Sequence, residues 1–208
     1  MSLIRSIAAT AAALACSVAT AASITFDFTG GSNNNTLPSV SYSNGGVDLT
    51  VTAYNTSVLG IVPVFVSRST SDGLGVFSVL DTTTDLDNSL VDNEFLRFAF
   101  DPSVDITSIT FSSYSTGLLS GLMRDFSYRF DGNGWVNASF GPSGVFTAFS
   151  GGDGVSDFYI APRLNQINDS FKIASLTIDF EPAPVSAPGT LALLGLSLAG
   201  LGLARRRR

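Results

Sequence analysis

The side chains best suited to chemistry in this sequence are carboxylates concentrated between residues 81 and 94. The candidate ligands of a metal ion in this stretch are Asp81, Asp85, Asp87, Asp92 and Glu94. Calcium takes roughly six to eight oxygen ligands, so this acidic set makes calcium the candidate cofactor. The spacing is not that of an EF-hand, because Leu86 stands where that loop needs glycine. An exposed loop with turn-forming Asp and Asn explains the same residues, and it is the favoured interpretation.

Most catalytic chemistry is excluded by residues that the chain lacks. It contains no histidine, and its single cysteine is Cys16, so neither a Ser-His-Asp triad nor a histidine metal site is available. A Ser-Lys dyad could use only Lys172, which has no S-x-x-K sequence beside it. Two carboxylates could still hydrolyse a glycoside, but Glu94 and Glu181 are the only glutamates. We therefore predict that the protein is not an enzyme, with a glycosidase as the open alternative.

Sugar binding is the second ligand chemistry that the residue types raise. The aromatic residues concerned are Trp135, Tyr42, Tyr54, Tyr114, Tyr128 and Tyr159. A glycan-binding surface needs exposed rings in a row, and Trp135 directly follows a predicted turn, where a side chain can face solvent. Trp135 is therefore the candidate ligand-binding residue. Aromatic residues at strand ends also pack in cores or at their rims, so a purely structural role is the alternative.

The elements that must position these residues are β-strands, because apolar and polar residues alternate with a period of two. Strands are predicted at residues 23–28, 47–54, 61–67, 75–80, 95–100, 106–114, 126–130, 135–140, 145–149, 158–161 and 171–180. The sequence D-G-N-G at 131–134 predicts a hairpin turn, since Asp-Gly and Asn-Gly supply positive φ angles. We predict that residues 22–180 form a single all-β domain, a jelly-roll-like β-sandwich with a phenylalanine-rich core.

Residues 1–21 have the features of a Sec-type signal peptide. Arg5 supplies a positive charge, residues 7–18 are apolar, and Ala19-Thr20-Ala21 is an A-x-A cleavage site that Ala22 follows. The chain is therefore expected to use the Sec export machinery, and cleavage would also remove Cys16.

The end of the chain predicts a membrane anchor. Residues 181–190 are a proline-rich linker, and residues 191–204 carry no charge and predict a transmembrane helix. Four arginines complete the chain, and a basic end is expected to stay on the cytoplasmic side. They are Arg205, Arg206, Arg207 and Arg208.

The order of these parts resembles the PEP-CTERM sorting signal of Gram-negative bacterial surface proteins. The residues that carry the resemblance precede the run Leu-Ala-Leu-Leu and are Val185, Ser186, Ala187, Pro188, Gly189 and Thr190. Ala187 stands where that family usually has Glu, and Ser186 where it has its first Pro. The resemblance implies anchoring in the inner membrane and processing by exosortase, a membrane peptidase; a plain membrane anchor is the alternative. The stretch from D-G-L-G-V at 72–76 to N-E-F-L-R-F at 93–98 more loosely resembles a pattern in the folded bodies of PEP-CTERM proteins. This resemblance implies a β-sandwich surface domain without known catalytic activity.

The predicted domain is strongly acidic. All seventeen acidic residues lie between Asp27 and Glu181, where only six basic residues occur, giving −11 against −6 for the whole chain. Such a surface repels nucleic acid. We therefore predict a non-enzymatic protein exported to the cell surface, secreted, or retained in an extracellular matrix such as a biofilm, with extracellular polysaccharide as a candidate partner. The alternative is a glycan-binding module of the same fold, with calcium as its candidate cofactor.

Overall fold

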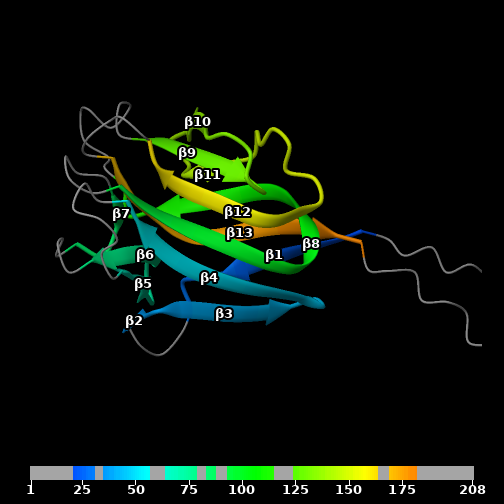
Figure 1. Ribbon diagram of the computed structural model, residues 1–208, viewed down its shortest axis with the longest axis horizontal. Helices are drawn as coiled ribbons and strands as arrows, with labels where there is room; N and C mark the ends of the chain where they lie inside the picture. The colour runs from blue at the N-terminus through cyan, green and yellow to red at the C-terminus, as the bar shows by residue number, and fades with distance from the viewer. Residues whose placement is uncertain are drawn as a thin grey trace, which may run out of the picture. The chain divides into compact units, whose positions relative to one another are not determined.

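The computed structural model describes residues 21–30, 35–56, 64–78, 83–87, 93–114, 124–163 and 169–181 (Figure 1). Ala21–Phe180 form one compact unit. The predicted linker, transmembrane helix and basic end lie outside the described residues, as does the signal peptide up to Thr20; only Ala21 and Glu181 at their margins are described. Within the described ranges, no helical segment has the length and apolar character that a membrane crossing requires.

The described residues are all-β with antiparallel strand pairing, as the sequence predicts. The strands are β1 (Ala22–Asp27), β2 (Asn35–Leu37), β3 (Ser39–Asn44), β4 (Val47–Asn55), β5 (Val64–Ser69), β6 (Gly73–Ser78), β7 (Leu86–Asp87), β8 (Glu94–Ser112), β9 (Asp125–Phe130), β10 (Val136–Ser139), β11 (Val145–Phe146), β12 (Val155–Pro162) and β13 (Ser170–Phe180).

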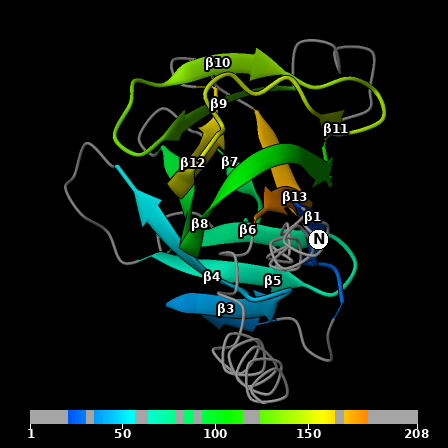
Figure 2. The same cartoon turned by 90° about the vertical axis from the view of Figure 1, so that its right-hand side faces the viewer.

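The longest strand, β8, joins two groups of strands and curves through the middle of the fold (Figures 1 and 2). Its first half pairs with β4 on one side and β12 on the other, and β12 continues to β9 and β10. Its second half pairs with β13 and β11, and β13 also pairs with β1, β6 and β7. β6 leads on to β5 and β2.

One prediction from the sequence is wrong here, because residues 95–100 and 106–112 are parts of one strand and not two strands, and this strand ends at Ser112 rather than at Tyr114. The intervening Asp-Pro-Ser looks like a turn, but the backbone around it stays paired. Asp101 lies opposite Asp48, Val104 opposite Val155 and Asp105 opposite Asp179. The exposed stretch Asp101–Ser103 is therefore where β8 passes from one group of strands to the other.

Two hairpins organise the group of strands around β4 and β12. β9 and β10 form the predicted hairpin, but the positive φ angles belong to Asp131 (41°) and Gly132 (80°) alone within D-G-N-G. β3 and β4 form a second hairpin through Gly45 (φ 59°) and Gly46 (φ 86°). The sequence analysis missed β3, because its S-V-S-Y-S-N composition contains little apolar alternation, although the following Asn-Gly-Gly is a turn signal.

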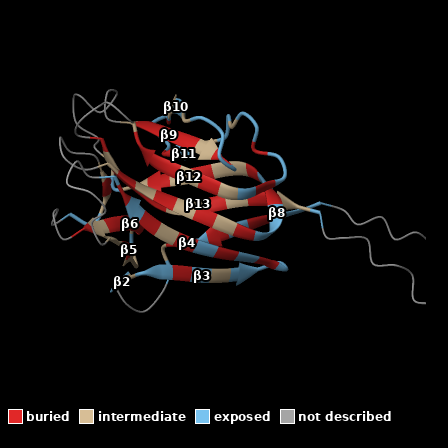
Figure 3. Ribbon diagram, viewed as in Figure 1, coloured by how far each residue is buried: buried red, intermediate tan, exposed pale blue. Residues whose placement is uncertain are grey.

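The core is rich in aromatic rings, as the many phenylalanines predict. Buried and less buried residues alternate along the strands, which Figure 3 shows as bands of red, tan and blue. Phe28, just after β1, contacts Phe98 of β8 with ring centroids 5.9 Å apart. Phe111 of β8 contacts Phe126 of β9 at 4.9 Å. Rings from both strand groups therefore meet in one hydrophobic core.

Candidate functional site

A set of aromatic and arginine side chains lies on the solvent-facing side of β4, β8, β9 and β12 and in the turn after β9. We call this set the aromatic face, and it consists of Tyr54, Phe95, Arg97, Arg129, Trp135 and Tyr159. The alternation that sends Ala53, Leu96 and Ile160 into the core leaves their neighbours in these strands on the opposite side. The members are exposed or half-buried, and Tyr54 is the most exposed aromatic among them at 37%.

The strand register aligns these side chains in rows across the sheet. Tyr54 of β4 lies directly opposite Phe95 of β8. In the next row, Arg97 of β8 lies opposite Tyr159 of β12, which in turn lies opposite Arg129 of β9. Because residues that are paired across antiparallel strands share a face, the register brings together residues that are far apart in sequence.

The rings of the aromatic face contact one another, one after the next, across the strands. Tyr54 and Phe95 are stacked, with centroids 5.1 Å apart and ring planes at 10°. Phe95 also contacts the edge of Trp135 at 6.1 Å and lies tilted against Tyr159 at 6.3 Å. The result is a continuous apolar strip, since each contact is within the range of favourable ring pairs.

Arg97 is held within the aromatic face by an ion pair. Its Nε donates to Asp157 Oδ1 at 2.9 Å and its Nη2 donates to Asp157 Oδ2 at 3.1 Å. Burial lowers the pKa of Arg97, but hydrogen bonds with Tyr54 and Asp157 outweigh it and raise the pKa on balance. This bidentate arrangement satisfies the charge of Arg97 inside the protein.

Arg129 has a different environment. Its guanidinium carbon lies 4.2 Å from the ring centroid of Tyr159 and 5.0 Å from that of Trp135, so it contacts both rings. Its Nε is buried and has no hydrogen-bond partner among the described residues. No carboxylate in the described part of the chain forms an ion pair with it.

The structure places Trp135, the predicted ligand-binding residue, in this face but half-buried rather than fully exposed. Tyr54 and Tyr159 join it, whereas Tyr128 is a core residue with 2% exposure, and Tyr42 and Tyr114 contact other parts of the fold. Sequence reasoning missed Phe95, Arg97 and Arg129 as members. Their outward positions in alternating strands were the available signal, but alternation alone does not say which strands are neighbours.

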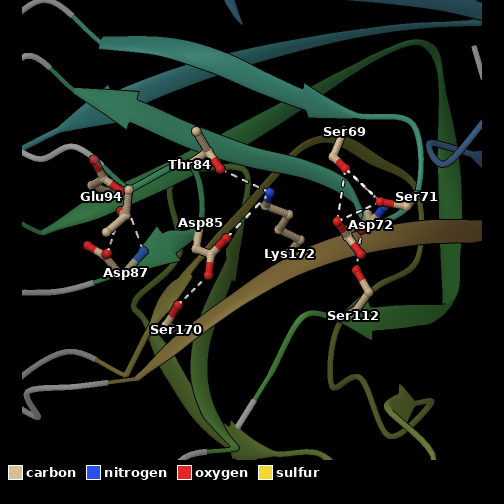
Figure 4. A network of polar contacts seen from close by, with 11 residues as sticks. Ser69, Ser71, Asp72, Thr84, Asp85, Asp87, Glu94, Ser112, Ser170 and Lys172 are labelled. Carbon is tan, nitrogen blue, oxygen red and sulfur yellow. Dashed lines mark hydrogen bonds and ion pairs between the residues drawn. The ribbon is translucent and has the colours of Figure 1, made fainter. Parts of the chain in front are cut away.

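One of the predicted calcium ligands, Asp85, belongs to a second polar network, around Lys172 (Figure 4). Lys172 is a buried lysine, 6% exposed, whose Nζ lies 3.4 Å from Asp85 Oδ1 and donates to Thr84 Oγ1 at 3.0 Å. The hydroxyl group of Ser170 donates to Asp85 Oδ2 at 2.9 Å. Asp85 is therefore paired with Lys172 and Ser170. Among the described residues, Lys172 pairs with Asp85 and Thr84 and not with the serine that a Ser-Lys dyad would need.

The remaining predicted calcium ligands lie close to this network or outside the described residues. Thr83 donates to Asp87 Oδ2 at 2.8 Å, and the backbone N–H of Asp87 donates to Glu94 Oε2 at 3.4 Å. Glu94 begins β8 and is only 1% exposed. Asp81 and Asp92 lie outside the described residues. Among those that are described, no group of three or more Asp, Glu, His or Cys side chains could hold a metal ion. The calcium site stays a prediction.

A third group of charges surrounds Asp169, which directly precedes β13. Asp169 is 1% exposed, and its Oδ2 has no hydrogen-bond partner among the described residues. Burial, followed by the charge of Asp125, raises the pKa of Asp169 to about 6. Asp125 itself accepts a hydrogen bond from Arg163 Nη1 at 2.7 Å and another from the hydroxyl group of Ser139. The raised pKa belongs to a carboxyl group that the fold buries without a full set of partners.

The fold and this surface define a class of protein: an antiparallel all-β domain with an aromatic and arginine strip on one sheet face. No protein-family model, curated protein or solved structure matches the chain.

Proposed function

We propose that this chain is a non-enzymatic, exported surface or extracellular-matrix protein whose folded body binds a glycan through the aromatic face. The observation that carries the glycan proposal is the row of touching rings from Tyr54 through Phe95 to Trp135 and Tyr159. A sugar ring has an apolar face of C–H groups that packs on aromatic rings, while its hydroxyl groups need polar partners nearby. Arg97, Asp157 and Arg129 are such partners within or beside the strip.

The finer architecture that we propose is a jelly-roll-like β-sandwich. The two strand groups that share β8 would form its two sheets, with the contacts Phe28–Phe98 and Phe111–Phe126 between them. This arrangement gives the aromatic face a rigid support, because the inward side chains of β4, β8 and β12 are locked in the core.

Export and sorting are proposed from the two ends of the sequence. A Sec signal peptide over residues 1–21 would start export, and the segment Val185–Thr190 with residues 191–208 would hold the protein in the inner membrane for an exosortase-type peptidase. Intact mass of the protein from the native envelope and medium tests this. A cut near Ala187–Thr190 supports sorting, whereas a mature species that still ends at Arg208 contradicts it and leaves a plain anchor.

Glycan binding is tested with the full-length chain and a panel of soluble polysaccharides, by affinity electrophoresis and calorimetry. We expect Trp135→Ala to weaken binding about tenfold or more, because truncating an aromatic anchor typically costs over 1.4 kcal/mol. Tyr114→Ala is the matched control, since Tyr114 is also half-buried beside an arginine, Arg124, but lies outside the aromatic face. The proposal fails if the wild-type chain binds no glycan, or if both variants weaken binding equally.

A further inference from the structure

We propose that the aromatic face selects acidic glycans, those carrying uronate carboxylates, through the guanidinium group of Arg129; this inference rests on the proposed glycan binding. The ligand class follows from a cation that the described protein leaves without an anionic partner. A neutral glycan would fill the apolar strip but would leave this cation without a counter-charge.

Comparison with two other arginines that flank β12 shows how Arg129 differs from them. Arg97 forms a bidentate ion pair with Asp157, and Arg163 pairs with Asp125 at 2.7 Å. Arg129 contacts two rings and, among the described residues, no carboxylate. In a body with seventeen acidic and six basic side chains, an arginine without an acidic partner is unexpected on charge balance alone.

The two rings also orient Arg129 for a ligand. With its guanidinium carbon 4.2 Å from the Tyr159 centroid and 5.0 Å from the Trp135 centroid, the side chain is restrained before binding. A planar guanidinium group presents its N–H donors along its edge, and this edge matches the two oxygens of a carboxylate. A restrained donor loses less conformational freedom on binding than a free surface lysine would.

The acidic character of the body makes this local cation decisive for a polyanion. The overall negative charge repels an acidic polymer at long range, and the repulsion is screened beyond roughly 8 Å at physiological salt. An acidic glycan is therefore bound most favourably where a cation lies directly beside the apolar strip, and Arg129 occupies such a position. The carboxylate would lie against Arg129 while neighbouring sugar rings pack on Phe95 and Tyr54.

The test compares polymers that share a backbone and differ in charge. Full-length protein is titrated with polygalacturonate and its methyl ester, hyaluronate and its methyl ester, and carboxymethylcellulose and hydroxyethylcellulose. We expect at least one acidic polymer to bind about tenfold more tightly than its neutral counterpart, as a charge-assisted contact predicts. Arg129→Gln should remove this preference, and Arg129→Lys, which keeps the charge and loses the fork, should retain part of it.

Arg124→Gln is the matched control, because Arg124 also lies over a ring, that of Tyr114 at 5.6 Å, outside the aromatic face. It should leave the preference unchanged. Equal wild-type affinity for acidic and neutral polymers would overturn the acidic selectivity while leaving glycan binding in place. Binding of no polymer would overturn both proposals. An equal loss in the Arg124 and Arg129 variants would overturn the assignment of selectivity to Arg129.

Discussion

The burial of the Asp169 carboxyl group can be tested directly, because replacing Asp169 with asparagine should stabilise the protein at neutral pH. The carboxyl group is 1% exposed, lies near the charge of Asp125, and has its pKa raised from 3.8 to about 6. The interaction of Arg163 with Asp169 opposes this rise without cancelling it. The folded state therefore holds a proton on Asp169 at pH values where the unfolded chain has lost it.

The sign and size of the effect follow from this difference in proton binding. Because the folded pKa lies above the unfolded one, the contribution of this group to stability is fully present below pH 3.8 and is lost as the pH rises through about 6. A difference of about two pKa units corresponds to at most about 3 kcal/mol. Asp169→Asn replaces the ionisable group with a neutral one of the same shape. We therefore expect the variant to gain up to about 3 kcal/mol at pH 7.5 and almost nothing at pH 3.5.

Urea unfolding of the full-length protein and the variant, measured from pH 3.5 to 7.5, determines both values. Asp153→Asn is the control, because Asp153 is an exposed aspartate in a turn, and it should change the free energy of unfolding by less than about 0.5 kcal/mol. A variant that is less stable than wild type at pH 7.5 would mean that the ionised carboxylate is stabilised by the fold. That result would refute the assignment of a raised pKa to Asp169.

Three further predictions concern the Lys172 network. In thermal melts, Gly75→Ala should destabilise the fold by about 1–3 kcal/mol, because a Cβ atom there would lie 2.1 Å from the carbonyl oxygen of Thr84. Gly134→Ala is the control and should be neutral, because no atom lies within 4 Å of its Cβ position. Lys172→Met should lower the free energy of unfolding in urea by about 2 kcal/mol, because Asp85 loses its cation. Adding Asp85→Asn should restore part of this loss, and a double variant as unstable as the single one would contradict the pairing. If the stretch from Asp81 to Glu94 binds calcium, millimolar calcium should raise the melting temperature of the full-length protein and EDTA should reverse this, whereas equal melting temperatures would remove the calcium hypothesis.

The strands were predictable where one face of the sheet is apolar and the other is not. The sequence from Val47 to Tyr54 alternates strictly, and β4 occupies Val47–Asn55. Strand β3 was not predictable in the same way, because Val40 is its only buried hydrophobic residue. The unity of β8 was hidden for another reason: Asp101-Pro102 resembles a turn, and only pairing with distant strands keeps that backbone extended.

The candidate site shows a similar division between local and non-local information. The hairpin signal at 131–134 placed Trp135 directly after a turn, but nothing local to it indicates Phe95 or Tyr159 as neighbours. Those contacts depend on the order β4, β8, β12, β9, which is set by pairing between residues as far apart in the sequence as Leu96 and Ile160. A single sequence does not contain that order in any local pattern.

Sheet stabilisation alone explains part of the aromatic face and leaves one member unexplained. Cross-strand aromatic pairs strengthen antiparallel sheets, and Tyr54 stacked on Phe95 is such a pair. An arginine added only for stability gains most from a carboxylate on the next strand, as Arg97 does with Asp157. Arg129 instead keeps a buried, unpartnered Nε between two rings, which costs free energy that the contacts with the rings must offset. An anionic ligand at the terminal N–H groups of this guanidinium would supply the carboxylate that no described residue provides, and for this reason Arg129, more than Trp135, favours a binding surface over a structural strip.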